Sequence, residues 1–177
     1  MPWLGPGARS GVLEEHPLDP AAHDRSGFDS GVPELDEYLR RYADQHRRRG
    51  ISAVYVLTDS SAPEVILGYY SLSAAEVDAP QLSEADRRRL PRYPVPCFRM
   101  GRLACRIDQR GRGLGRLLVG CAVERCLKAR IQVAAYALIV DAKDDLAKAF
   151  YEHYGFTPFA GRPSTLYLPL GPGRSKG

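Results

Sequence analysis

The stretch Arg110–Gly115, which reads Arg-Gly-Arg-Gly-Leu-Gly, has the residue types and spacing that most clearly predict a chemical task. It follows an apolar, strand-like segment and opens an amphipathic, helix-like one. Glycines let the main chain approach an anion closely, converging N–H groups bind its oxygens, and a helix N-terminus adds about half a positive charge. This context predicts a phosphate-binding loop, although a glycine-rich turn taken alone can also be purely structural.

The spacing of these glycines excludes two common nucleotide-binding loops. The P-loop pattern G-x-x-x-x-G-K-S/T has no match in the chain. The dinucleotide pattern G-x-G-x-x-G also fails, because its last position falls on Arg116 when read from Gly111 and on Leu118 when read from Gly113. The pattern that fits is Q/R-x-x-G-x-G/A.

The basic residues are the second feature that suggests a ligand. The formal net charge is +4, and 21 of the 25 basic residues are arginine. Many of them stand in runs: Arg40-Arg41, Arg47-Arg48-Arg49 and Arg87-Arg88-Arg89. Because a guanidinium binds phosphate through two N–H donors, these runs indicate a phosphate-rich partner. The alternative is that they are solvated helix ends.

The cysteines and histidines give no sign of a metal site. The four cysteines lie in apolar segments outside any C-x-x-C pair: Cys97, Cys105, Cys121 and Cys126. We therefore expect reduced thiols in a cytosolic protein. The four histidines lack metal-ligand spacing. We expect neither a secretory signal nor a membrane span, because the longest nearly apolar run is far shorter than the roughly 20 residues that a bilayer requires.

Length and composition fit one globular domain. The chain has 177 residues, of which 44% are hydrophobic and 26% charged, which is enough to bury a core. Proline and glycine accumulate at both ends. We therefore expect an irregular N-terminal extension over residues 1–20, a domain over 21–170 and a flexible tail over 171–177.

Hydrophobic periodicity predicts helices that alternate with strands in this domain. Helices are expected from Pro33 to about Gly50, after Ser83, from Leu114, and over Asp144–Tyr154. Ser30 or Gly31 is expected to cap the first of them, and Gly155 to end the last. Strands are expected over residues 53–57, 65–73, 97–107, 135–140 and 165–168. This alternation predicts an α/β or α+β class with a mixed sheet.

Two patterns in order along the chain resemble the Gcn5-related N-acetyltransferase (GNAT) superfamily. Arg110–Gly115 is similar to motif A, the pyrophosphate loop, and Ala147–Phe156 is similar to motif B, A-x-x-F-Y-x-x-x-G-F. The resemblance implies a single α+β GNAT domain with a mixed, mostly antiparallel central sheet flanked by helices. It also implies a splayed pair of parallel strands that form the acetyl-CoA cleft.

Further segments resemble the toxin branch of this superfamily, found in bacterial toxin–antitoxin pairs: residues 23–31, 68–73, 94–96, 101–104 and 165–170. The resemblance implies transfer of acetyl from acetyl-CoA to the α-amine of aminoacyl-tRNA, which stops translation. It also implies a ribbon-helix-helix antitoxin and often a toxin homodimer. The chain departs from many members at Asp141, where they have histidine, and at Cys105, where they have an apolar residue.

The resemblance assigns roles residue by residue. It implies a cofactor-binding set made up of Leu103, Ala104, Cys105, Arg110, Gly111, Arg112, Gly113, Leu114, Gly115 and Arg116. A main-chain N–H near Leu103 or Ala104 would polarise the thioester carbonyl. Tyr151 is the candidate general acid, because a phenol of pKa ~10 can protonate a forming thiolate whose thiol pKa is ~8.5. The alternative is that Tyr151 only packs, which is the interpretation we favour for Tyr154.

The expected acceptor follows partly from the central strand, because residues 101–105 contain no carboxylate that could act as a base. A lysine amine has a pKa of ~10.4, whereas an α-amine titrates at ~7.7–8.0 and needs little help to lose its proton. This difference favours an aminoacyl ester. The candidates for contact with tRNA phosphates are Arg40, Arg41, Arg87, Arg88, Arg92 and Arg99. The alternatives are acetylation of a small-molecule amine or protein N-terminus, and a non-catalytic acyl-CoA-binding module.

Overall fold

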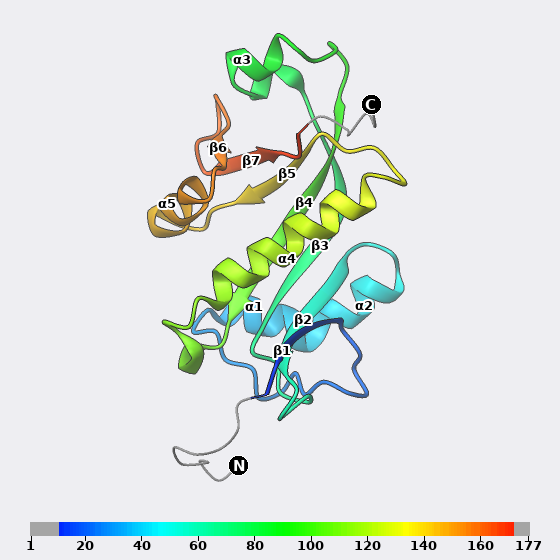
Figure 1. The fold of residues 1–177 in the computed structure, drawn as a ribbon, viewed down its shortest axis with the longest axis vertical. Coiled ribbons are helices and arrows are strands. Elements are labelled where there is room, and N and C mark those ends of the chain that lie inside the picture. The colour runs from blue at the N-terminus through cyan, green and yellow to red at the C-terminus, as the bar shows by residue number, and fades with distance from the viewer. Residues whose placement is uncertain (1–10, 172–177) are drawn as a thin grey trace. The chain divides into compact units, whose positions relative to one another are not determined.

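The computed structural model describes residues 11–171, in which the strands form one mixed sheet with the order β1-β2-β3-β4-β5-β7-β6 (Figure 1). The strands are β1 (Leu13–Pro17), β2 (Ala53–Asp59), β3 (Gly68–Val77), β4 (Val95–Cys105), β5 (Ala137–Asp141), β6 (Thr157–Pro158) and β7 (Thr165–Pro169). The α-helices are α1 (Pro33–Glu37), α2 (Ala43–Arg48), α3 (Glu84–Arg87), α4 (Leu114–Ala129) and α5 (Asp145–His153). The π-helix η1 (Tyr38–Tyr42) joins α1 to α2, and the short 3-10 helices are η2 (Ala79–Gln81) and η3 (Ile107–Gln109). The predicted mixed sheet with flanking helices is confirmed.

The contacts between residues divide the described chain into two compact units. Unit 1 comprises residues 11–71 and 102–118, and unit 2 comprises residues 72–101 and 119–171. Both units therefore contain part of β3, β4 and α4. No helix within residues 11–171 combines the length and the hydropathy needed to cross a bilayer.

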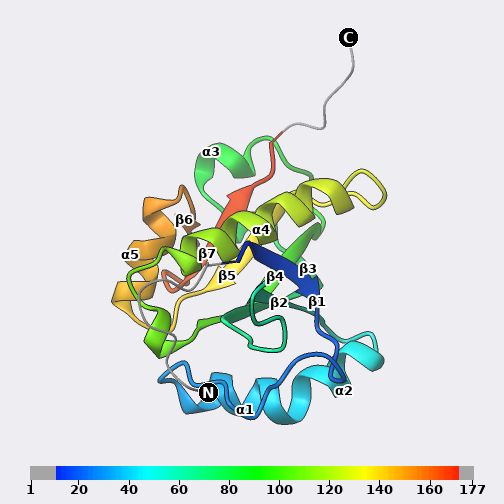
Figure 2. The same cartoon turned by 60° about the horizontal axis from the view of Figure 1, so that its bottom comes forward.

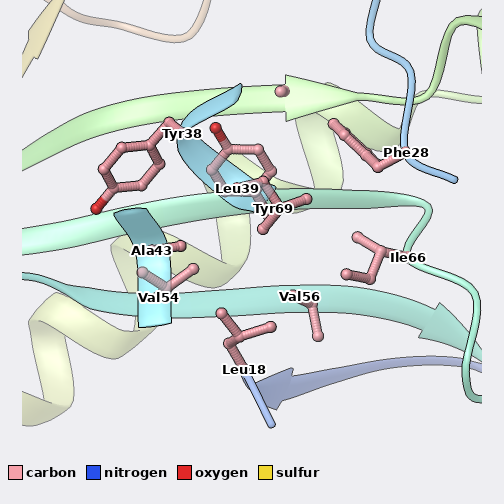
Figure 3. Packing of buried hydrophobic residues seen from close by; sticks show 10 residues of the cluster. Leu18, Phe28, Tyr38, Leu39, Ala43, Val54, Val56, Ile66 and Tyr69 are labelled. Carbon is pink, nitrogen blue, oxygen red and sulfur yellow. The ribbon is translucent and has the colours of Figure 1, made fainter. Parts of the chain in front are cut away.

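In unit 1, the helical segment from α1 through α2 packs against β2 and the first residues of β3 (Figure 2). Its inward side chains are Tyr38, Leu39 and Ala43, which pack on Val54 of β2 and Tyr69 of β3 (Figure 3). The register of Leu13↔Asp59 through Pro17↔Tyr55 makes β1 and β2 antiparallel. The helix expected between Pro33 and Gly50 is thus present.

The cap of this first helix differs from the expectation. Val32 occupies the N-cap position, and its apolar side chain cannot accept a hydrogen bond from the first turn of the helix. Ser30 instead donates its N–H and its hydroxyl to one oxygen of the buried Asp36 carboxylate, at 3.0 and 2.6 Å. A buried carboxylate needs such donors, since leaving it without hydrogen bonds would be costly. The side chain of Ser30 is thereby engaged with Asp36 and does not cap the helix.

The expectation of an irregular segment up to residue 20 was wrong for Leu13–Pro17, which forms β1. This five-residue stretch, Leu-Glu-Glu-His-Pro, has no β-branched residue, so its sequence gives no strand signal. Pairing with β2 over its whole length decides the conformation. The predicted extension over 1–10 and the predicted tail over 172–177 lie outside the described residues.

In unit 2, β5 lies between β4 and β7. β4 and β5 run parallel, with the residue pairs Phe98↔Leu138, Arg99↔Ile139 and Met100↔Val140. The β5–β7 pairs run antiparallel from Ala137↔Pro169 to Asp141↔Thr165. Alternate residues of these strands face one buried apolar cluster, which contains Val77, Leu82, Cys97, Ala137, Ile139, Phe159 and Tyr167.

A polar network fixes α3 at the edge of this cluster. The Asp86 carboxylate accepts hydrogen bonds from the hydroxyls of Tyr167 at 2.5 Å and Ser83 at 2.9 Å. These bonds, that of Tyr167 above all, hold the pKa of Asp86 below its ordinary value, so this carboxyl stays charged at neutral pH. Ser83 Oγ also accepts from the Asp86 N–H and so caps α3, which is the helix expected after Ser83.

The packing of Gly68 leads to a prediction about stability. A Cβ at this position would lie 2.8 Å from Leu118 Cδ1 and 3.0 Å from the main-chain oxygen of Ala104. The buried Leu118 and the β4 main chain cannot both move away at low cost. Gly68→Ala is expected to lower the free energy of unfolding by about 1–3 kcal/mol in denaturant titrations.

The matched control for this variant is Gly120→Ala in α4, where an added Cβ would meet nothing within 4 Å. Because alanine favours helix more than glycine does, the control is expected to gain about 0.5–1 kcal/mol. Equal stability of the Gly68→Ala and wild-type chains would contradict the close packing described here.

Candidate active site

The glycine loop has the geometry of an open anion-binding site at a helix N-terminus. Gly111 and Gly113 adopt left-handed backbone, with φ of +83° and +71°, which glycine tolerates best. α4 begins immediately afterwards, anchored by the buried side chain of Leu114, and runs for 16 residues. A Cβ on either glycine would meet nothing within 4 Å, so the space above the loop is free for a ligand.

Arginines surround this loop, and Arg110, Arg112 and Arg116 are exposed. Arg112 donates a hydrogen bond to the side-chain oxygen of Gln109 in η3. The residues predicted for the pyrophosphate, from Arg110 to Arg116, are therefore gathered at one turn, as their closeness in sequence requires. With the helix dipole, these cations create a local positive potential suited to a diphosphate.

The carboxyl end of β4 leads into η3 and carries the other predicted cofactor-binding residues. Ala104 is buried, while Leu103 and Cys105 are half-buried. Burial raises the pKa of the Cys105 thiol to about 11, so this cysteine is a neutral thiol at pH 7 and a poor nucleophile. No covalent acyl transfer through Cys105 is expected from these properties.

Beside these residues, Arg102 makes a contact that the sequence did not reveal. Its guanidinium carbon lies 3.5 Å from the centroid of the Tyr38 ring in η1. This cation–π contact ties β4 to the first helical segment. No spacing signal could have predicted it, because the partners are far apart in the chain.

Tyr151 lies in unit 2 on the inner side of α5 and is 7% exposed. The rings of Phe150 and Phe156 meet it edge-on, with centroids 5.4 Å away in each case. Asp144 fixes the start of α5 by accepting a hydrogen bond from the Ala147 N–H at 2.7 Å. The aromatic neighbours therefore hold the phenol in a fixed orientation.

Tyr154, by contrast, is half-buried in an aromatic cluster. Its ring lies edge-on to Phe150 at 4.9 Å and to His153 at 5.0 Å. These contacts agree with a packing role, which is the role that we favoured from the sequence.

The arginines proposed as tRNA contacts are distributed between both units. Arg40 and Arg41 are exposed on η1 in unit 1, and Arg41 pairs with Glu37 at 3.4 Å. In unit 2, Arg88 pairs with Glu84 at 2.5 Å. Exposed pairs of this kind are worth less than about 1 kcal/mol, so a phosphate can displace the carboxylate easily.

The other exposed candidates, Arg87 and Arg92, also belong to unit 2. Nearby, Arg89 and Arg130 line a hollow of about 660 Å³ together with Leu90 and Tyr136. Two guanidinium groups and the Asp86 carboxylate therefore line this concave surface, and the exposed Arg87 and Arg92 add positive charge to unit 2.

Arg99 differs from the other candidates because it is only half-exposed and engaged in a network across three strands. It donates to one oxygen of Asp141, whose other oxygen accepts from Thr165 Oγ1 at 2.8 Å. The network joins β4, β5 and β7 at the carboxyl end of β5. Sequence reasoning missed it because the residues come together only through strand register.

The described residues contain no group of three or more His, Cys, Asp or Glu side chains placed to hold a metal ion. All four cysteines are free thiols.

Comparisons with known proteins agree with this geometry. Residues 50–158 match the acetyltransferase (GNAT) domain family. A tRNA-acetylating toxin of Mycobacterium tuberculosis is 35% identical over 147 residues, which cover 83% of this chain and 86% of that protein.

Two solved structures share the fold over most of both chains. AtaT complexed with acetyl-methionyl-tRNAfMet has a TM-score of 0.84 and 28% identity, covering 89% of this chain and 95% of that one. A tyrosine-to-phenylalanine mutant of AtaT bound to the C-terminus of the antitoxin AtaR and acetyl-CoA has a TM-score of 0.77 and 27% identity, covering 89% and 93%.

Proposed function

The chain belongs to the GNAT acetyltransferase family, and from this premise we propose that it is a toxin that acetylates aminoacyl-tRNA. The reaction transfers the acetyl group of acetyl-CoA to the α-amine of the aminoacyl ester and so blocks translation. The observation that carries the proposal is the open glycine loop at the N-terminus of α4, in a chain 35% identical to a tRNA-acetylating toxin.

The glycine loop is suited to the diphosphate of acetyl-CoA. Positive φ at Gly111 and Gly113 turns the loop, and the missing side chains leave the space above it open to phosphate oxygens. The main-chain N–H groups from Gly111 to Gly115 would bind these oxygens, and Arg110 and Arg112 would neutralise their charge. Leu114 holds the loop on the protein by burying its side chain.

Acetyl-CoA supplies an acetyl group that is already activated as a thioester. The enzyme therefore has mainly to orient the amine and to stabilise the charges that develop during the reaction. A main-chain N–H at Leu103 or Ala104 would donate to the carbonyl oxygen as negative charge develops there. As the amine nitrogen bonds to the carbonyl carbon, the carbon–sulfur bond breaks. Tyr151 would donate its hydroxyl proton to the departing sulfur. The amine loses one proton to solvent, and solvent returns a proton to the Tyr151 phenolate.

The acceptor proposed is the α-amine of an aminoacyl ester. Residues 101–105 of β4 contain no carboxylate. The Asp141 carboxylate at the end of β5 accepts hydrogen bonds from Arg99 and Thr165, so both of its oxygens are already engaged. At pH 7 an α-amine is partly neutral and can attack without a strong base, whereas a lysine amine is almost fully protonated.

The partners proposed follow from the same function. An antitoxin with a ribbon-helix-helix domain would cover the toxin, and the toxin would form a homodimer. AtaT, a structural neighbour, is bound to the C-terminus of its antitoxin. Since charged tRNA is consumed in the cytoplasm, the proposed reaction takes place there.

The test is incubation of the purified chain with labelled acetyl-CoA and a mixture of charged tRNAs, followed by identification of the acetylated amino acid. We expect label in N-acetyl-aminoacyl-tRNA and none in uncharged tRNA. Label only in free amines or in protein N-termini would overturn the choice of acceptor. Binding of acetyl-CoA without any transfer would point to a non-catalytic module.

Reversing the charge of Arg87-Arg88-Arg89 tests the tRNA surface. The triple change to glutamate is expected to reduce kcat/KM for aminoacyl-tRNA about tenfold or more, because phosphate contacts carry sequence-independent affinity. The salt dependence of the rate should also become shallower. The Kd for acetyl-CoA, measured by calorimetry, is the internal control and should not change. An unaltered rate with tRNA would remove the α3 region from the proposed surface.

A further inference from the structure

The turn Asp29–Gly31 lies against the segment that leads into the glycine loop. The Ile107 N–H of η3 donates to the main-chain oxygen of Asp29 at 2.8 Å. The Asp29 side chain in turn accepts from the Gly31 N–H at 2.8 Å. Two segments far apart in sequence are thus joined by main-chain contacts beside the loop.

Charge strengthens this junction. Arg106, which precedes η3, is bound by both oxygens of Asp108, at 3.0 and 2.9 Å. The hydrogen bonds that Arg106 donates to Asp108 raise the pKa of Arg106, and the nearby carboxylates of Asp29 and Asp24 act in the same direction. Arg106 is therefore fixed by an ion pair within its own segment and attracted by the carboxylates of Asp24 and Asp29.

Gly31 is the point of closest approach to the loop arginine. Its φ is +79°, and a Cβ built there would lie 3.2 Å from Ile107 Cδ1 and 3.3 Å from Arg110 Nη2. The guanidinium of Arg110 therefore rests over a position where a side chain would stand. An alanine at this position would require Ile107 or the Arg110 guanidinium to shift by a few tenths of an ångström, and a larger side chain would require more.

We propose that Gly31 is a positioning residue for acetyl-CoA, because its missing side chain lets the Arg110 guanidinium lie beside the glycine loop. This inference rests on the proposed function, in which Arg110 neutralises the diphosphate. Arg110 is exposed and its side chain is flexible, so contact with Gly31 restricts the places it can occupy. Restricting it beforehand lowers the entropy cost of binding the anion.

The chain provides a matched control in Gly50. Its φ is +69°, close to that of Gly31, but a Cβ there would meet nothing within 4 Å. Gly31→Ala and Gly50→Ala thus impose similar backbone strain, while only the former disturbs Arg110. Thermal unfolding of both variants checks that each is folded and measures that strain.

The decisive measurement compares two acetyl donors. Gly31→Ala is expected to raise the Kd for acetyl-CoA about tenfold, which corresponds to ~1.4 kcal/mol of binding free energy. Gly50→Ala is expected to change this Kd less than about twofold. With acetyl-pantetheine, which lacks the diphosphate, kcat/KM should be the same for Gly31→Ala and Gly50→Ala. Equal effects of the two variants on acetyl-CoA binding would overturn the inference.

A double-mutant cycle with Arg110→Ala identifies the route. If Gly31 acts through Arg110, Gly31→Ala should have no further effect on the Kd in the Arg110→Ala background. A full effect in that background would instead assign the coupling to Ile107 and refute the role given to Arg110. Failure of the wild-type chain to bind acetyl-CoA would refute the proposed function itself, an outcome distinct from equal effects of the two glycine variants.

Discussion

Replacing Tyr151 by phenylalanine is expected to lower kcat for acetyl transfer by about two to three orders of magnitude, because general acid catalysis contributes about 10²–10⁴-fold. The change removes one oxygen and leaves the aromatic ring. The edge-on contacts with Phe150 and Phe156 should therefore persist, and Tm should remain close to that of the wild type. Single-turnover kinetics with charged tRNA separate this chemical step from binding.

Tyr154→Phe is the matched control, since Tyr154 is the C-cap residue of the same helix and packs against the same Phe150 ring. We expect it to retain nearly full activity. In cells, expression of the wild-type chain without its antitoxin should halt growth, and Tyr151→Phe should relieve the arrest. A Tyr151→Phe chain as toxic and as active as the wild type would refute the role of general acid.

Substituting Gly113 by valine is expected to raise the Kd for acetyl-CoA by about 10–100-fold. At a φ of +71°, a β-branched residue is strongly disfavoured, so the loop would move to another conformation. The valine side chain would also occupy the open space above the loop where phosphate oxygens are proposed to bind. Isothermal titration with acetyl-CoA measures the loss directly.

Gly50→Val controls for backbone strain, because Gly50 has a φ of +69° and lies at the end of the first helical segment. Both variants should lose stability by similar amounts, whereas only Gly113→Val should lose affinity. Retained affinity in a folded Gly113→Val chain would show that the diphosphate is bound elsewhere.

The elements that carry the proposed chemistry could be predicted from the sequence, because the residues that predict each of them lie close together in the chain. Helical spacing predicted α5 around Tyr151, and Ser83 was recognised as a cap from its immediate neighbours. The glycine loop was recognised in the same way, since its left-handed conformations depend on residue type at Gly111 and Gly113. Boundaries were less certain: the strand expected over 65–73 is Gly68–Val77, because pairing with neighbouring strands decides where a strand ends.

The amino-acid sequence by itself determined the glycine loop, the helix around Tyr151 and the alternation of helices with strands, since each depends on residues within a few positions of one another. Tertiary structure alone decided that Leu13–Pro17 is a strand and that Arg99 is bound by Asp141. It also decided that Gly31 lies beneath Arg110. These contacts join segments distant in the chain, and only the register and packing of the folded sheet bring such segments together.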